Sequence, residues 1–405
     1  MNEPAARSLE YWAAVRGDEP ALHEGRSSLT YREWNEYADL LADAFAGRGL
    51  GVDDVIAVRC RNRVEWAVIA LACAKIDARL LTLDPDLPAA TIRQQLIASA
   101  VSAIIVGDMA PVRIAAALDG LSLRLRASMD ATYPGFYNFW DLFPPVAQPR
   151  FGRVQPSLMA WTPGAVGSYV SLPRRRAAPA SISRAPVPEE GASLITVPMH
   201  RSWGGTQFWA ALTAGRQVVL MRAFNAADAL DVIRTRRITH WCAFPETFIE
   251  LRRHADKIGA ADTSSLKDVT IGGAAAPWML KAWLIDVFGP VVSEAYGSAQ
   301  AGYIATLPAE AFAAKRGSCG RPVRGAAVEI RDAHGHRLPP GMVGEIWART
   351  PRTLECELGG EARQARRDAQ GFVATCDAGH LDQDGFLYLA GRPASLANGA
   401  DRKAG

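Results

Sequence analysis

One stretch of the sequence combines a histidine with large aromatic residues. His200 can exchange a proton near neutral pH, and Trp203, Trp241 and Phe244 follow it in the next predicted elements. Aromatic walls with few polar groups are typical of sites that bind small organic molecules. Large aromatic side chains also fill protein cores. The pattern therefore leaves two alternatives open: a flat apolar pocket with His200 as a base at its mouth, or plain core.

Other arrangements of reactive residues are absent from the sequence. The six cysteines are scattered and include no C-x-x-C pair, so they indicate neither a disulfide framework nor a zinc site. There is no H-E-x-x-H, no G-x-S-x-G, and no G-x-G-x-x-G that opens a βαβ unit. Metalloenzyme, protease and Rossmann dehydrogenase functions therefore find no support, and we expect no metal.

The composition is that of an ordinary globular protein. Of 405 residues, 49% are hydrophobic and 21% are charged. The formal net charge of +3 is too small to mark a nucleic-acid binder. The longest apolar run, residues 66–74, is far shorter than the roughly 20 residues that span a bilayer, and the N-terminus lacks an export signal. We expect a cytoplasmic protein of two or three compact units, without a membrane span or a nucleic-acid partner.

Strand and helix signals alternate over the first hundred residues and again after Ala192. Thr30 and Glu33 form a T-x-x-E capping box before residues at helical spacing. Short β-branched runs separated by helical patterns predict an α/β sandwich with a largely parallel sheet. The predicted strands are 21–24, 29–31, 55–58, 80–83, 103–106, 193–197, 217–221 and 239–243, with helices around 65–76, after Pro88, from Gln207 and from Ala226.

The pattern changes after Gly317. Short strands with Gly and Pro turns follow, which predict a small β-barrel or a twisted antiparallel subdomain. The expected division is a first α/β subdomain at 1–190, a second at 191–316, the small β-barrel at 317–392 and a hinge remnant at 393–405.

Several segments, in this order, resemble the adenylate-forming superfamily of acyl-CoA synthetases, adenylation domains of peptide synthetases and luciferases. The resemblance covers nearly the whole chain. It is carried by PMHRSWGG at 198–205, THWCAFPETF at 239–248, IGGAAAP at 271–277, EAYGSAQAG at 294–302, GSCGRPVRG at 317–325, GEIWART at 344–350 and ATCDAGHLDQDGFLYLAGR at 374–392. It implies the large N-terminal domain of that fold, built of layered α/β sandwich subdomains plus a small β-barrel. The C-terminal lid domain, which carries the catalytic Lys in relatives, would begin after Arg392 and is expected to be absent.

The residues that hold triphosphate in this superfamily are altered here. The family's phosphate loop, Thr-Ser-Gly-Thr-Thr-Gly-x-Pro-Lys-Gly, corresponds to residues 162–171. Pro163 removes a backbone donor, and Val170 replaces the Lys. Gln300 replaces the Glu that binds magnesium in relatives, and a neutral amide is a poorer ligand for a hard cation than a carboxylate. The resemblance therefore implies impaired adenylation.

Other site residues implied by the resemblance are retained. For the nucleotide, Asp377 would contact the ribose with help from Arg392, and Tyr296 would flank an adenine-sized slot at the GGAAAP turn. The full expected nucleotide set is Gly273, Ala274, Glu294, Tyr296, Asp377 and Arg392. The expected acyl pocket has His200 at its mouth and is formed by His200, Trp203, Trp241, Phe244 and Gly297, the last leaving room for a ring.

Three functions follow from this combination. The first is an enzyme that binds an acyl or aryl thioester or adenylate and passes the acyl group to a thiol or amine. CoA or the phosphopantetheine of a carrier protein is then the expected cofactor, with ATP or AMP as a weaker expectation. The second is a pseudo-enzyme that binds a metabolite or supports a synthase subunit. The third is a true ATP-dependent acid–CoA ligase whose lid is supplied in trans.

Overall fold

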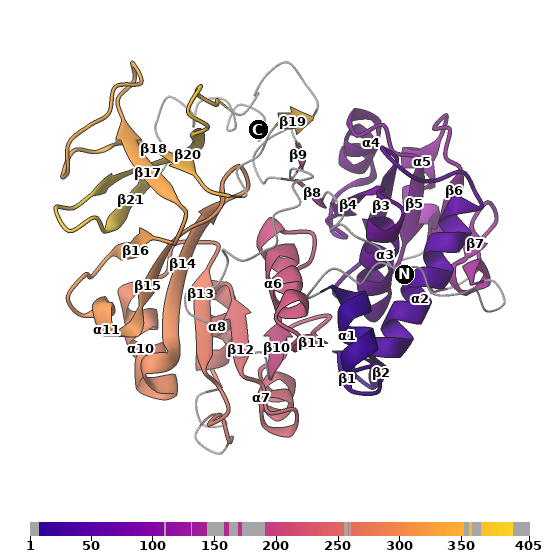
Figure 1. The fold of residues 1–405 in the computed structure, drawn as a ribbon, viewed down its shortest axis with the longest axis horizontal. Helices are drawn as coiled ribbons and strands as arrows, with labels where there is room; N and C mark the ends of the chain where they lie inside the picture. The colour runs from indigo at the N-terminus through magenta and orange to yellow at the C-terminus, as the bar shows by residue number, and fades with distance from the viewer. Residues whose placement is uncertain are drawn as a thin grey trace.

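Two large sheets form the frame of the computed structural model (Figure 1). The structure describes residues 8–108, 111–130, 132–143, 158–161, 169–171, 191–254, 258, 261–351, 356–358 and 366–391. The confirmed fold class is the mixed α/β fold that the sequence predicts, and the layers stack in the order αβαβα.

The eight-stranded sheet has the order β19-β9-β8-β4-β3-β5-β6-β7, and all its strands except β19 come from the first half of the chain. The six neighbouring strands β8, β4, β3, β5, β6 and β7 run parallel. All five residues of the central strand β3 are buried, as expected for a parallel strand covered on both faces. The strands are β3 (Val55–Arg59), β4 (Arg79–Leu83), β5 (Ala103–Val106), β6 (Leu125–Ser128), β7 (Tyr137–Asn138), β8 (Leu158–Trp161), β9 (Tyr169–Ser171) and β19 (Cys356–Leu358).

The thirteen-stranded sheet runs through the rest of the described chain, from β17 at one edge to β2 at the other. Its parallel part is β1, β11, β10, β12, β13 and β14. The strands are β1 (Pro20–Glu24), β2 (Ser27–Thr30), β10 (Ala192–Ile195), β11 (Gln217–Leu220), β12 (His240–Ala243), β13 (Asp268–Gly272) and β14 (Val292–Ser298). Strands β1 and β2 thus join the sheet of the second half of the chain, although they lie within the expected 1–190 subdomain.

The same sheet continues into a twisted antiparallel part near the C-terminus, at the upper left of Figure 1. Its inward-facing residues form a core of their own around Tyr296, Ile330 and Ile346. The strands are β15 (Gly302–Pro308), β16 (Ser318–Pro322), β17 (Ala327–Arg331), β18 (Gly344–Arg349), β20 (Val373–Leu381) and β21 (Leu387–Gly391).

Helices cover both sheets, and three of them fill the space between the sheets. The main core there combines α2, α3 and α6 with the inner faces of both sheets. Helices α4 and α5 cover the outer face of the smaller sheet, and α7, α8 and α10 cover that of the larger. The helices are α1 (Leu9–Val15), α2 (Tyr31–Ala46), α3 (Val64–Lys75), α4 (Ala89–Ala98), α5 (Ala115–Leu118), α6 (Ser202–Thr213), α7 (Ala226–Thr235), α8 (Pro245–Arg252), α10 (Trp278–Phe288) and α11 (Ala309–Phe312).

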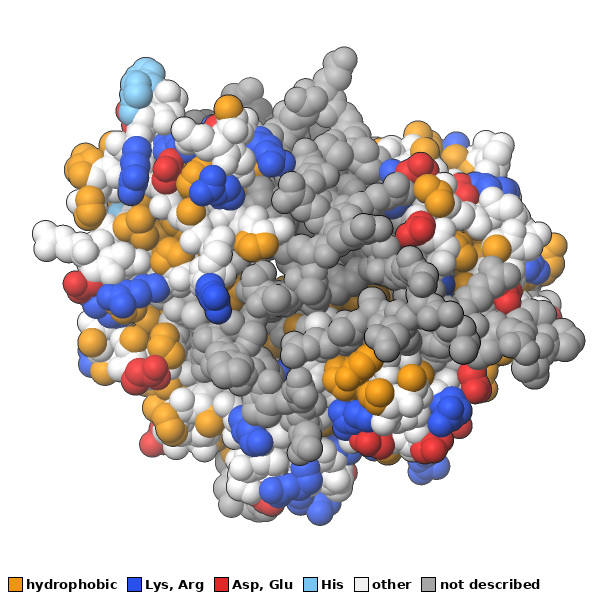
Figure 2. Space-filling model, in the orientation of Figure 1, with side chains coloured by type: hydrophobic (Ala, Val, Ile, Leu, Met, Phe, Trp, Pro, Cys, Tyr) orange, Lys and Arg blue, Asp and Glu red, His pale blue; other side chains and the backbone are white. Residues whose placement is uncertain are grey.

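The surface carries charges of both signs. On the face shown in Figure 2, Lys and Arg side chains are interspersed with acidic and hydrophobic ones. Within the described ranges, no helix combines the length and apolar character needed to cross a membrane.

Candidate active site

The candidate site lies where the carboxyl ends of strands from both sheets meet. Asn62 follows β3, and only 3% of it is exposed. Its Nδ2 donates to the carbonyl of Val197 at 3.0 Å, and its Oδ1 accepts from the N–H of Met199 at 2.8 Å. One buried amide therefore holds the segment that follows β10 and, with it, the position of His200.

His200 faces a carboxylate from the other sheet. Its Nε2 lies 3.4 Å from Oδ2 of Asp84, which follows β4, and the two side chains are 13% and 28% exposed. Burial lowers the pKa of His200 from its usual value of 6.5, while Asp84 opposes the shift. The imidazole is therefore mainly neutral at pH 7 and can accept a proton. The role of His200 as a base stays a prediction, but it now has a partner that the sequence did not indicate.

Trp203 and Phe244 come together at the carboxyl end of β13. Their ring centroids are 5.7 Å apart, with an interplanar angle of 53°. A Cβ on Gly273 would lie 2.3 Å from Cε1 of Phe244 and 3.2 Å from Cε3 of Trp203, and Gly273 has a φ of +77°. Both the space and the backbone conformation therefore require glycine. These rings and the exposed turn at Gly273 and Ala274 form one apolar wall.

The first turn of α6 sets the place of Trp203. A Cβ on Gly204 would lie 2.4 Å from the carbonyl oxygen of Pro198, so the helix packs directly on the loop that carries His200. The Nε1 of Trp203 is buried and has no hydrogen-bond partner among the residues that the structure describes. Packing alone therefore holds the indole in place.

Trp241 does not join this wall. Its indole is 1% exposed, contacts the rings of Phe224, Phe248 and Phe288, and donates from Nε1 to the hydroxyl of Thr196 at 3.2 Å. These aromatic contacts belong to the core beneath α7, α8 and α10. For Trp241, the structure favours the core alternative that the sequence left open.

Gly297 lies at the exposed end of β14, where the neighbouring strand comes close. A Cβ there would lie 2.4 Å from the carbonyl oxygen of Gly302 across the ladder. This contact is sufficient to explain the glycine, without a substrate ring beside it.

The structure brings together two residues expected at the nucleotide. The hydroxyl of Tyr296 donates to Oδ2 of Asp377 at 2.9 Å. Burial raises the pKa of Tyr296 well above its usual value, so the phenol stays protonated and remains a donor. Asp377 follows Cys376, which has a φ of +65° within a stretch of β20 where the register with β18 shifts.

Glu294 is engaged elsewhere. Its Oε2 accepts from Nζ of Lys281 on α10 at 2.8 Å, and the two side chains are 9% and 4% exposed. Burial raises the pKa of Glu294, and Lys281 opposes that shift. The carboxylate is therefore committed to an ion pair under α10 rather than offered to a ligand.

The remaining expected residues are only partly described. Arg392 and residues 162–168 lie outside the described residues, and Val170 is described only by the backbone pairing of β9. Gln300 lies in the turn after β14 and is partly exposed. Among the residues that the structure describes, no group of three or more His, Cys, Asp or Glu is arranged to hold a metal ion.

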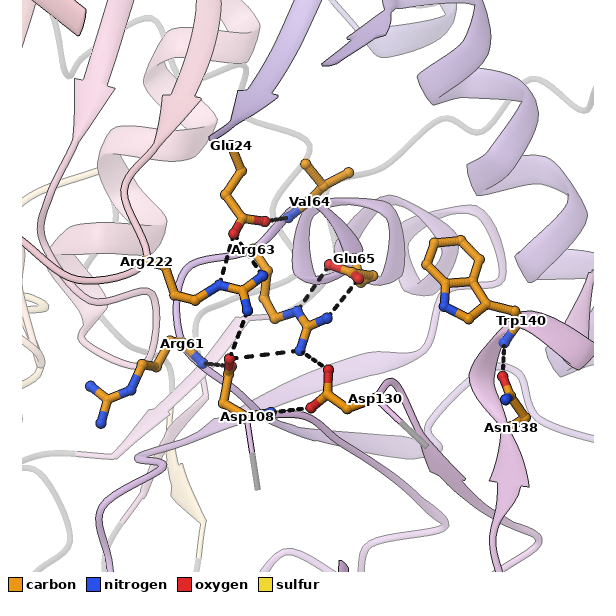
Figure 3. Close-up of polar contacts among 10 residues, drawn as sticks. All are labelled: Glu24, Arg61, Arg63, Val64, Glu65, Asp108, Asp130, Asn138, Trp140 and Arg222. Atoms are coloured by element: carbon orange, nitrogen blue, oxygen red, sulfur yellow. Dashed lines mark hydrogen bonds and ion pairs between the residues drawn. The ribbon is translucent and has the colours of Figure 1, made fainter. Parts of the chain in front are cut away.

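A charged network that the sequence reasoning missed joins the two sheets beside this site (Figure 3). Arg222, after β11, contacts Glu24 of the same sheet at 2.7 Å and Asp108 of the other sheet at 3.1 Å. The N–H of Val64, at the start of α3, donates to Glu24 at 3.2 Å. The interface network consists of Glu24, Arg61, Arg63, Glu65, Asp108, Asp130 and Arg222. Most of these residues come within a few positions after the end of a predicted strand. That position in the sequence was the signal that could have revealed the network.

Comparisons with known proteins point to one family. The model of the family described as AMP-binding enzyme matches residues 9–133 and 175–356. The indoleacetate–CoA ligase of Aromatoleum aromaticum is 27% identical over 397 residues, covering 95% of this chain and 77% of the ligase. The fatty acid–[acyl-carrier-protein] ligase ScoC of Streptomyces coeruleorubidus is 27% identical over 389 residues, covering 92% and 73%.

Solved structures agree with the sequence matches. The amide bond synthetase McbA from Marinactinospora thermotolerans superposes with a TM-score of 0.81 and 26% identity, over 92% of this chain and 77% of that protein. The anthranilate CoA ligase AuaEII, solved with anthranoyl-AMP, gives a TM-score of 0.85 at 17% identity, over 97% of this chain and 78% of that one. At that identity the second similarity concerns the fold alone.

Proposed function

The chain belongs to the AMP-binding enzyme family, and from this premise we propose that it binds an acyl or aryl derivative of a carboxylic acid and transfers the acyl group to a thiol or amine. The acyl donor is a thioester or a preformed adenylate. The acceptor is CoA, the phosphopantetheine of a carrier protein, or an amine. Relatives whose names include CoA ligase, carrier-protein ligase and amide bond synthetase support this range of acceptors.

The observation that carries the proposal is the pair of His200 and Asp84 beside the apolar wall. Nε2 of His200 lies 3.4 Å from Oδ2 of Asp84. Trp203 lies on the same short segment as His200, and its indole packs on the turn at Gly273. A neutral imidazole next to an apolar surface is suited to take a proton from an acceptor that attacks a bound acyl group.

In the proposed step, the acceptor thiol or amine gives its proton to His200 and its sulfur or nitrogen forms a bond to the acyl carbon. The bond between that carbon and the departing thiolate or AMP then breaks, and the leaving group carries away the electron pair. A departing thiolate takes the proton back from His200, and when AMP departs the proton passes from His200 to water. Thioester exchange of this kind is nearly thermoneutral, so it depends chiefly on positioning.

Weak adenylation is part of the proposal. Gln300 offers a neutral amide where a carboxylate is the better partner for a hard cation. The carboxylate of Asp377 already accepts a hydrogen bond from Tyr296, so one of its oxygens is less available to a ribose hydroxyl. Residues 162–171 add Pro163 and Val170 to the same argument from the sequence.

Acyl transfer from a panel of alkyl and aryl CoA thioesters to cysteamine and to a carrier protein, followed by mass spectrometry, tests the function. We expect transfer by the unmodified protein and at least a tenfold loss in His200→Gln. The matched control is His254→Gln, because His254 faces Glu250 at 3.5 Å on the surface and is 38% exposed. Absence of transfer over the whole panel, or equal loss in both variants, would contradict the proposal.

The names of the relatives favour a second candidate, ATP-dependent ligation. Exchange of labelled pyrophosphate into ATP separates the two. We expect exchange near background with each acid of the panel. Rapid exchange would indicate that the main reaction is ATP-dependent activation of the acid and not acyl transfer.

A further inference from the structure

The indole of Trp203 lies directly on the backbone that forms the floor of the candidate pocket. A Cβ on Gly272 would lie 3.3 Å from Cη2 of Trp203, and one on Gly273 would lie 3.2 Å from Cε3. The benzene ring of the indole therefore covers both glycines. The ring of Phe244 closes the space from the side, at 2.3 Å from the same Cβ position on Gly273.

These distances leave no layer for a second ring. Adding a Cα–Cβ bond of about 1.5 Å, the Cα atoms of Gly272 and Gly273 lie at most about 5 Å from the indole. A flat ring placed between them would need two carbon contacts of about 3.5–4.0 Å, or about 7–8 Å in all. The gap is too small by about 2–3 Å.

We propose that Trp203 closes the ring-binding part of the pocket, so that the protein takes a compact aliphatic acyl group and excludes flat aryl groups. The inference rests on the proposed function for its substrate class, since it treats the wall beside His200 as the acyl pocket. It narrows the substrates of that proposal from acyl and aryl groups to compact aliphatic acyl groups. It assigns this selectivity to the side chain of Trp203. Phe244 closes the same space from the side at Gly273, whereas the indole covers both Gly272 and Gly273.

The way in which Trp203 is held makes this assignment testable by substitution. Its Nε1 has no hydrogen-bond partner within the described part of the chain, so removing the indole breaks no polar contact there. Gly272 ends strand β13 and pairs with Ala295 of β14, and Gly273 is the next residue. The backbone at both glycines is therefore held by the sheet and does not depend on the indole. Trp203→Gly therefore leaves an indole-shaped apolar slot, and such cavities bind apolar rings.

The first experiment measures binding and needs no acyl transfer. Indole is titrated into the unmodified protein and into Trp203→Gly, with calorimetry and ligand-observed NMR as readouts. We expect at least tenfold tighter binding of indole to Trp203→Gly. The matched control is Trp140→Gly, because Trp140 is 51% exposed and its indole contacts the rings of Phe139 and Phe143 rather than the wall at Gly273. Equal affinity in all three proteins would overturn the inference.

The second experiment compares transfer of butyryl and 2-naphthoyl groups from their CoA thioesters. We expect the unmodified protein to prefer butyryl, and the ratio of kcat/KM for naphthoyl over butyryl to rise at least tenfold in Trp203→Gly. Equal use of both thioesters by the unmodified protein would overturn the inference while leaving the proposed function intact. Selective binding of indole to Trp203→Gly without transfer in any protein would support the closed slot and contradict the proposed function.

Folding of the variants is checked by circular dichroism and thermal unfolding. If Trp203→Gly does not fold, Trp203→Leu takes its place, because leucine keeps part of the packing but lacks the flat ring. We then expect the ratio of kcat/KM for naphthoyl over butyryl to be higher in Trp203→Leu than in the unmodified protein. The reverse order would refute the assignment.

Discussion

Asp84→Asn should lower the pKa of His200 further. Burial already lowers it from the usual 6.5, and Arg201 and Arg61 act in the same direction, whereas Asp84 and Asp86 raise it. Asparagine keeps the size of the side chain but removes its negative charge. The protonated imidazole then loses its nearest counter-charge, at 3.4 Å.

The size of the shift follows from this distance. Two unit charges 3.4 Å apart interact by about 1.2 kcal/mol in water and by about 5 kcal/mol at an effective dielectric constant near 20. Asp84 is 28% exposed, which places the pair closer to the weaker limit. At about 1.4 kcal/mol per pKa unit, we expect a decrease of about 1–2 units.

Histidine-selective NMR titration measures this pKa directly, without any assumption about activity. The control is Asp332→Asn, because Asp332 faces His336 at 3.3 Å while that imidazole is 79% exposed. Asp332→Asn should leave the pKa of His200 unchanged, because the charges that act on that imidazole are those of Asp84, Arg201, Asp86 and Arg61. An unchanged or raised pKa of His200 in Asp84→Asn would refute the role of Asp84. If His200 acts as the base, the acid limb of the pH–rate profile moves to lower pH by the same amount.

Three further changes test other parts of the structure. Tyr296→Phe removes the hydrogen bond that Oδ2 of Asp377 accepts from the phenol. We expect about fivefold tighter AMP binding by calorimetry, from about 1 kcal/mol for one hydrogen bond, and weaker binding would argue against this competition. Lys281→Met leaves the carboxylate of Glu294 buried without its cation, so urea unfolding at pH 7 should show a loss of about 3–5 kcal/mol, mostly absent when Glu294→Leu is added. Burial lowers the pKa of His240 to about 3. In the unfolded chain this imidazole becomes protonated near pH 6.5, whereas in the folded chain it stays neutral at that pH. The contribution of this residue should therefore lower the free energy of unfolding by about 2 kcal/mol between pH 7 and pH 5. His240→Asn should remove that contribution.

Local signals in the sequence predicted strands β1 to β5 and β10 to β12 and several of the helices between them. The hydroxyl of Thr30 accepts from the N–H of Glu33, and the carboxylate of Glu33 accepts from the N–H of Thr30, as a capping box requires. Strand β5 and helix α7 begin where predicted. Helix α6 begins at Ser202 rather than at the predicted Gln207. Gly204 and Gly205 are poor helix formers, so the sequence gives no helix signal in this turn. The small size of Gly204 is needed where the helix meets the loop after β10.

Sequence patterns could not show which face of a buried strand is the functional one. In a strand covered on both faces, neighbouring residues are equally apolar, so the pattern cannot separate a wall of the site from the core. Trp241 turned out to lie in the core, whereas Phe244, just past the end of β12, lies at the site. Pairings such as Asn62 with Met199 join segments far apart in the chain, and no local rule predicts them.

The pairing of β1 with β11 bears on the order in which the chain can fold during synthesis. Leu22 lies opposite Val218. The first strand can pair at once with its antiparallel neighbour β2, but its parallel partner is made roughly 200 positions later. At about 5–20 residues per second, this wait lasts about 10–40 s. Strands β3 to β7 of the smaller sheet have all been synthesised before then, so the first strand joins the larger sheet only after the central strands of the smaller one exist.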